Sequence, residues 1–186
     1  RGIDTGDISQ RMVISNVYEL PFFKKNKGWD RRILGGWQLN SITTLQTGDP
    51  IEVSGANNFT SINWPDLLSN PTLKGSDRNP YRWFNTDSFR NPADWTIGNT
   101  SRSLPDTRNP GMFTMNLSLF KVFKTSEKVR TEIRAEAFNA VNHVNLSAPN
   151  ASFSPNRQGV STNALFGRVT AARPARRLQF GVRLSW

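Results

Sequence analysis

Five segments of the chain alternate apolar and polar residues with a period of two. In an extended chain this pattern places apolar side chains on one face of a sheet and polar side chains on the other. Most of the segments are about ten residues long, which is the length that a tilted membrane-spanning strand requires. We therefore expect strands at about residues 10–20, 33–47, 112–123, 129–139 and 177–186.

The alternation is cleanest in the fourth segment, which also has a helical interpretation. Glu, Arg and Ala favour helices, and Glu132 and Glu136 have the spacing of neighbours on a helix surface. On a helix, however, arginine and small apolar residues would share the same stripes, and no continuous apolar face would form. The period of two therefore favours a strand, whose polar face holds Arg130, Glu132, Arg134 and Glu136.

The segments between the expected strands differ strongly in length. Residues 22–32 and 124–128 form short connections, whereas residues 55–111 and 140–176 form long ones that are rich in polar residues. Loops of that length are uncommon in compact soluble domains. Short turns at one end of the strands and long loops at the other are typical of outer-membrane barrels. We expect an all-β fold, an antiparallel up-and-down segment of a transmembrane β-barrel with long extracellular loops.

The composition excludes several kinds of chemistry. The 186 residues include no cysteine and one histidine, His143, so they hold no thiolate metal site, cysteine nucleophile or second imidazole ligand. We therefore expect no catalytic residue, metal or cofactor, and no enzymatic activity. The hydrophobic fraction of 36% is low for a globular domain, but it fits strands with one lipid-facing side.

The net charge of +10 raises the question of nucleic acid as a partner. The positive residues are dispersed, however, and no known nucleic-acid-binding module is present, so we expect no nucleic acid. Two basic clusters stand out. One lies in the first short connection and consists of Lys24, Lys25, Lys27, Arg31 and Arg32. The other lies before the last strand and consists of Arg168, Arg173, Arg176 and Arg177.

Six motifs along the chain resemble those of a known family. They are VISNVYELPF (13–22), LGGWQLNSITTLQTGDPI (34–51), WFNTDSF (83–89), NLSLFKVF (116–123), RAEAFNAVNHVN (134–145) and RLQFGVRLSW (177–186). In this order they resemble the C-terminal end of the β-barrel of TonB-dependent outer-membrane transporters. The resemblance is nearest to the Oar-like group, whose members carry a carboxypeptidase-regulatory-like domain. It covers nearly the whole of residues 1–186.

The resemblance implies a place and a role. The last strand of such barrels ends at the periplasm, so the short connections would be periplasmic turns and the long ones extracellular loops. The chain would lie in the bacterial outer membrane and take part in the uptake, or export, of a bulky solute. The implied partners are outer-membrane lipid, lipopolysaccharide, the plug and remaining strands of the same chain, the energy-transducing TonB complex and the outer-membrane assembly machinery.

Five strands are too few for a closed barrel, since single-chain barrels have at least eight strands and plugged transporters about 22. The residues also include no plug domain, and they open on Arg1-Gly2 without Met. We therefore expect residues 1–186 to be the C-terminal part of the barrel of a longer chain.

The resemblance and the alternation together suggest three groups of functional residues. The lumen-facing residues would be Gln38, Asn40, Asn116, Ser118, Arg130, Glu132, Arg134, Glu136 and Arg183. The signal for barrel assembly would be Phe180, Val182, Leu184 and Trp186. The arginines expected to contact lipopolysaccharide phosphates at the outer rim are Arg168, Arg173, Arg176 and Arg177.

An alternative is a soluble, secreted all-β module that binds a carbohydrate or another ligand. In that case, aromatic residues of the first long loop would form a sugar platform. We favour a small private core that holds the loop in shape. The residues concerned are Trp64, Trp83, Phe84, Phe89 and Trp95.

Overall fold

The computed structural model describes residues 3–22, 28–124 and 129–186. Contacts divide the chain into two compact units. The sheet unit consists of residues Arg11–Leu45, Phe113–Val144 and Pro174–Trp186. The loop unit consists of residues Arg1–Gln10, Gln46–Met112 and Asn145–Arg173.

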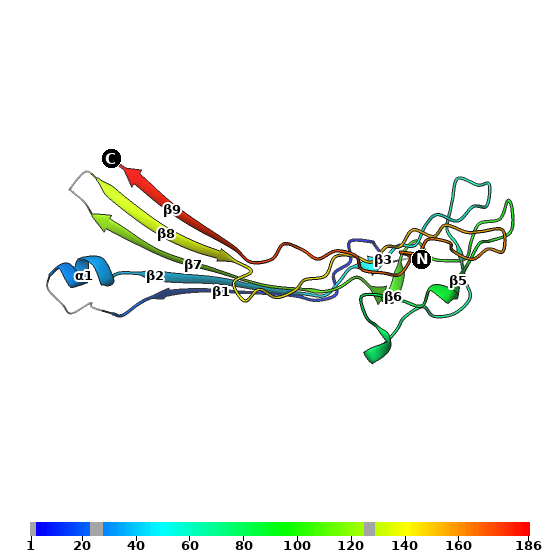
Figure 1. The fold of residues 1–186 in the computed structure, drawn as a ribbon, viewed down its shortest axis with the longest axis horizontal. Coiled ribbons are helices and arrows are strands. Elements are labelled where there is room, and N and C mark those ends of the chain that lie inside the picture. The colour runs from blue at the N-terminus through cyan, green and yellow to red at the C-terminus, as the bar shows by residue number, and fades with distance from the viewer. Residues whose placement is uncertain (1–2, 23–27, 125–128) are drawn as a thin grey trace. The chain divides into compact units, whose positions relative to one another are not determined.

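The sheet unit is built on one five-stranded sheet (Figure 1). Its strands are β1 (Arg11–Glu19), β2 (Gln38–Gln46), β7 (Met112–Lys124), β8 (Arg130–Phe138) and β9 (Arg177–Ser185). They lie in the order β1-β2-β7-β8-β9, and the arrows in Figure 1 alternate in direction. Four of the five predicted ranges contain one of these strands, and β7 extends one residue beyond the predicted 112–123, to Lys124. The predicted all-β, antiparallel fold is confirmed.

The start of the second predicted strand is wrong. Residues 33 and 34 belong to a short helix, α1 (Trp29–Leu34), and β2 begins at Gln38. The helix ends because Gly36 adopts a left-handed backbone conformation with φ of 74°, which glycine tolerates and which commonly follows a helix. A helix of six residues is too short to produce a recognisable period. The lysines at 24, 25 and 27 and most of the second short connection lie outside the described residues.

The register of β7, β8 and β9 defines two faces of the sheet. Ala135 lies between Leu119 on β7 and Phe180 on β9. Every second residue from these positions along each strand points to the same side of the sheet, and this side is the apolar face. This face holds Leu117, Leu119, Ile133, Ala135, Ala137, Leu178, Phe180, Val182 and Leu184. The intervening positions give the polar face, which holds Ser118, Arg130, Glu132, Arg134, Glu136, Gln179 and Arg183.

The apolar face is strongly exposed along β9 and partly exposed along β7 and β8. Phe180 keeps 79% of its surface and Val182 keeps 70%, and every residue of β1 and β9 is exposed. An apolar surface of this kind needs a partner, because contiguous exposed apolar patches are rare on soluble monomers. Among the described residues, no helix is long and apolar enough to cross a membrane.

The loop unit has its own core. It consists of Ile51, Val53, Ala56, Phe84, Phe89, Leu104, Phe153 and Phe166. The ring of Phe166 has an edge-on arrangement with three others, at centroid distances of 5.2 Å from Phe84, 5.6 Å from Phe89 and 5.7 Å from Phe153. Because Phe153 and Phe166 come from the second long loop, the two loops share this core. The private-core interpretation is confirmed for Phe84 and Phe89, but it is wrong for Trp95, which keeps 76% of its surface and lies outside this core.

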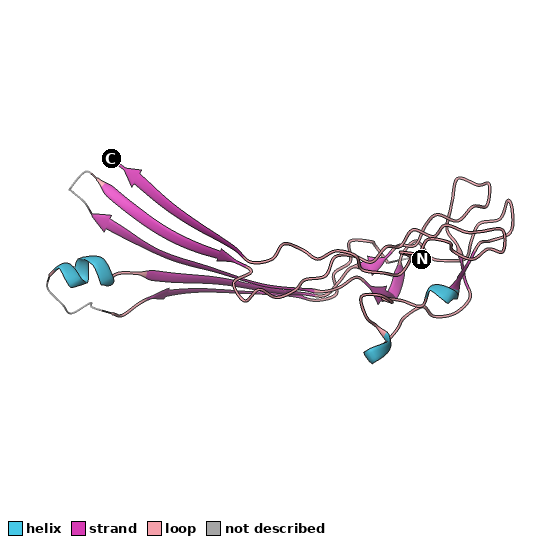
Figure 2. Ribbon diagram, viewed as in Figure 1, coloured by secondary structure: helices cyan, strands magenta, loops and turns pink. Residues whose placement is uncertain are grey.

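Short elements and backbone hydrogen bonds organise the rest of the loop unit (Figure 2). Strand β3 (Pro50–Ile51) pairs with β6 (Leu104–Arg108), and β4 (Asp66–Leu67) pairs with β5 (Phe89–Arg90). The 3-10 helices are η1 (Gly75–Asp77) and η2 (Thr86–Ser88). The two long loops bond to each other directly, since Trp83 N donates to Gly167 O at 2.8 Å and Val169 N donates to Pro80 O at 2.7 Å.

Candidate functional site

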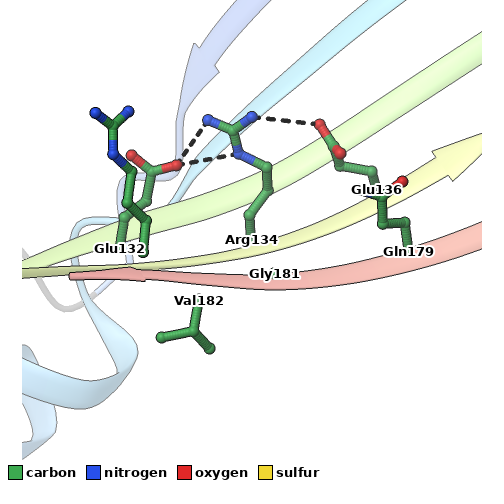
Figure 3. A pocket seen from close by; sticks show the side chains of 7 residues that line it. Glu132, Arg134, Glu136, Gln179, Gly181 and Val182 are labelled. Carbon is green, nitrogen blue, oxygen red and sulfur yellow. Dashed lines mark hydrogen bonds and ion pairs between the residues drawn. The ribbon is translucent and has the colours of Figure 1, made fainter.

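A row of alternating charges runs along β8 on the polar face (Figure 3). Arg134 lies between two glutamates and forms ion pairs with both, at 2.6 Å to Glu132 and 3.6 Å to Glu136. The pairs form because residues two apart on a strand point to the same side. The register adds Arg183 of β9 directly opposite Glu132. In Figure 3, Val182 points to the other side of the sheet.

These charges are accessible to water. The side chain of Arg134 keeps 45% of its surface, and those of Glu132 and Glu136 keep 23% and 22%. Ion pairs with this exposure contribute at most about 1 kcal/mol each to stability. The row therefore does little to hold the sheet together, and its main effect is to make this face polar and hydrated.

A hollow of about 360 Å³ lies next to the charged row on the same face. Its lining combines polar and charged residues with four apolar ones. The polar and charged members are Asn40, Ser41, Asn116, Ser118, Arg134 and Glu136, and the apolar members are Ile42, Leu117, Phe120 and Phe138. The guanidinium carbon of Arg134 lies 5.8 Å from the Phe120 ring centroid, within range of a cation–π interaction.

The structure brings all nine predicted lumen-facing residues onto the polar face. Gln38 donates a hydrogen bond from Nε2 to Asn40 Oδ1 at 2.9 Å, which places both on one side of β2, and Asn40 lines the hollow. Sequence analysis missed Phe120 and Phe138. The adjacent apolar pair Leu119-Phe120 breaks the alternation of β7, and this break is the signal that could have revealed Phe120.

The apolar face holds one residue that the pattern does not explain. Lys121 lies opposite Ile133, among apolar neighbours, and keeps only 5% of its surface. Its Nζ donates to the backbone oxygens of Arg32, Ile33 and Gly35, at the C-terminal end of α1. The carbonyl end of a helix carries partial negative charge, so it compensates the buried ammonium group.

The four residues predicted as an assembly signal are all exposed. Phe180, Val182 and Leu184 follow one another at alternate positions on the apolar face of β9, and Trp186 comes directly after the strand with 93% of its surface exposed. The structure thus shows an amphipathic edge strand here. Its role as an assembly signal stays a prediction.

The four arginines expected to contact lipopolysaccharide belong to different units. Arg168 and Arg173 lie in the loop unit, and Arg176 and Arg177 lie in the sheet unit. Arg168 lines a cavity of about 300 Å³ together with Tyr81, Arg82 and Asp87. Arg176 is held by its own sheet neighbours, since its Nη1 donates to Ala140 O at 3.3 Å.

Other polar groups in the loop unit hold its structure. The guanidinium carbon of Arg78 lies 3.9 Å from the Trp83 ring centroid, and both side chains donate to Arg108 O at 2.8 Å. Burial lowers the pKa of the Arg78 guanidinium. Trp83 is thus structural, as the private-core interpretation predicts.

His143 of the sheet unit stands edge-on to Phe113, with ring centroids 5.4 Å apart. In the described part of the chain, no three His, Asp or Glu side chains cluster so that they could hold a metal ion.

An antiparallel sheet with an exposed apolar face and a charged, hydrated face has the properties that the wall of a membrane-spanning β-barrel requires. Residues 1–179 match the family model described as an outer membrane beta barrel domain, and the chain belongs to this family. The protein is therefore located in the bacterial outer membrane, which decides against the soluble, secreted module. No curated protein and no solved structure matches the chain significantly.

Proposed function

We propose that the chain is the C-terminal part of the barrel of a TonB-dependent transporter of the Oar-like group, which moves a bulky solute across the outer membrane. The observation that carries this proposal is the ordered set of six motifs. Five of them overlap the five strands of the sheet, in the order in which the strands lie side by side. Completion of the barrel then requires further strands and a plug from the same protein.

In this proposal the polar face is a lumen wall. The hydrated row at Arg134 and the hollow at Phe120 supply charged, hydrogen-bonding and aromatic groups side by side. Such a mixture suits contact with a plug or a passing solute, which must be bound weakly enough to leave. The apolar face lies against lipid, and the long loops lie outside the cell. The assembly machinery inserts the barrel, and basic residues of the loops contact lipopolysaccharide.

The test is a direct interaction with the energy-transducing complex. The full-length protein, solubilised from outer membranes in detergent, is passed over immobilised periplasmic domain of TonB. We expect specific retention, whereas a general porin prepared in the same way passes through. Failure of the full-length protein to bind TonB would overturn the transporter proposal, although the chain would still belong to the barrel family.

A further inference from the structure

Two aromatic side chains of the loop unit are exposed and held in contact with each other. Phe59 keeps 60% of its surface and Trp95 keeps 76%, and their ring centroids lie 5.7 Å apart with 28° between the ring planes. They come from segments 36 residues apart in sequence. The shared phenylalanine core of the loop unit includes neither ring.

Both residues have a backbone conformation that bulky side chains rarely adopt. The φ angles are 57° at Phe59 and 63° at Trp95, in the left-handed region that glycine tolerates and aromatic residues do not favour. Folding therefore strains the backbone at two positions and leaves two large rings in water. Strained conformations persist where the surroundings enforce them, and they concentrate at ligand-binding sites.

A buried amide enforces this geometry. Asn58 keeps 1% of its surface, and its Nδ2 donates to Ile62 O and to Thr96 O, both at 2.8 Å. Its backbone oxygen accepts from Trp95 N at 2.8 Å. The side chain and the backbone oxygen of Asn58 thus tie the two ring-bearing segments together, so the rings are positioned before any ligand arrives. Preorganisation of this kind reduces the entropy that binding must overcome.

The residues around the pair indicate the kind of ligand. Residues 55–63 and 91–97 contain no Lys or Arg, so an anionic group finds no cation within these segments. Four exposed polar side chains lie in the same two segments, and in the part of the chain that the structure describes they form no hydrogen bonds. These side chains are Asn57, Ser61, Asn63 and Asp94.

We propose that Phe59 and Trp95 form a platform for a neutral carbohydrate chain. The rings offer apolar, polarisable faces for the C–H faces of sugar rings, and the flanking amides, hydroxyl and carboxylate offer partners for sugar hydroxyl groups. A protein partner would need a broader apolar patch than two rings, even with Ile62 and Ile97 of the same segments exposed as well. Ligand binding at this surface does not depend on the transport mechanism.

The test uses the full-length protein in detergent and isothermal titration calorimetry with four neutral probes: maltohexaose, cellohexaose, xylohexaose and laminarihexaose. We expect at least one to bind. Trp95→Ala and Phe59→Ala should each weaken that binding at least tenfold, and Trp95→Phe should change it less than threefold. Trp29→Ala, which removes another exposed tryptophan from the sheet unit, is the matched control and should leave binding unchanged.

Glycine variants separate a binding role from a structural one. Phe59→Gly relieves the strained backbone, so it should abolish binding while the unfolding temperature stays unchanged or rises. A clear fall in unfolding temperature would mean that the ring is structural and would overturn the proposal. The absence of binding to all four oligosaccharides would also overturn the proposal. Dissociation of an oligomer in the Trp95→Ala variant would overturn it as well, because the rings would then mediate self-association.

Discussion

Substitution of Lys121 by Met removes the ammonium group that joins β7 to the end of α1. Three backbone oxygens accept hydrogen bonds from this group, those of Arg32, Ile33 and Gly35. Met keeps the apolar stem of the side chain, so the packing of the apolar face changes little. The substitution therefore isolates the contribution of the charge and its hydrogen bonds.

The change in the free energy of α1 detachment can be estimated from the backbone oxygens that lose their hydrogen-bond donor. Ile33 O also accepts from Trp37 Nε1 at 3.1 Å, so it stays bonded, and two carbonyls lose the ammonium donor. A hydrogen bond to a charged group contributes about 1.5–3 kcal/mol, and water that enters the opened site recovers part of this. We expect the free energy needed to detach α1 from β7 to fall by about 2–4 kcal/mol, which corresponds to about a 30- to 900-fold larger detached population.

Trypsin cleavage after Arg32 measures this population, because cleavage of a briefly opened segment follows its equilibrium opening. The full-length protein in outer membranes or detergent should be cut within residues 28–36 much faster in the Lys121→Met variant than in the wild type. Arg130→Met, which removes an exposed cation from the neighbouring strand, is the control and should not change the rate. An unchanged rate in Lys121→Met would refute the role assigned to the lysine.

Two further predictions concern the loop unit and the basic residues. Phe166→Ala should destabilise the loop unit by about 3–5 kcal/mol, since the ring contacts three core phenylalanines. Limited proteolysis within residues 145–173 measures this destabilisation, and protection equal to that of the wild type would contradict the prediction. Replacement of all four basic-cluster arginines by Gln should weaken lipopolysaccharide binding and reduce its salt dependence, as measured by co-sedimentation. Unchanged binding would contradict the proposed contact with lipopolysaccharide. These four are Arg168, Arg173, Arg176 and Arg177.

The strands and their faces could be predicted because the period of two is a local property. On β8 the residues at alternate positions share a face, so the sequence alone places Glu132 and Arg134 on the same side of the strand. The resemblance then supplied the class of protein, and the family match supports an outer-membrane barrel.

Features that depend on contacts between distant segments could not be predicted. In the sequence pattern, Lys121 is an unexplained charge on the apolar face. Its position is explained only by the backbone carbonyls at the end of α1 that accept its hydrogen bonds. Phe166 joins Phe84 in one core only because the two long loops fold together. The left-handed backbone at Phe59 and Trp95 also has no signature in the sequence, because it occurs where Asn58 joins two segments that are far apart along the chain.

The central claim is that one face of the sheet meets lipid and the other meets water. The 186 residues contain no cysteine, so a single introduced thiol is unique within this region. Four variants of the full-length protein in outer membranes test the two faces of β9: Gln179→Cys and Arg183→Cys on the polar face, Phe180→Cys and Val182→Cys on the apolar face. A water-soluble, membrane-impermeant maleimide should label the first two variants and spare the other two. Equal labelling at all four positions, or labelling of the apolar pair alone, would contradict the account.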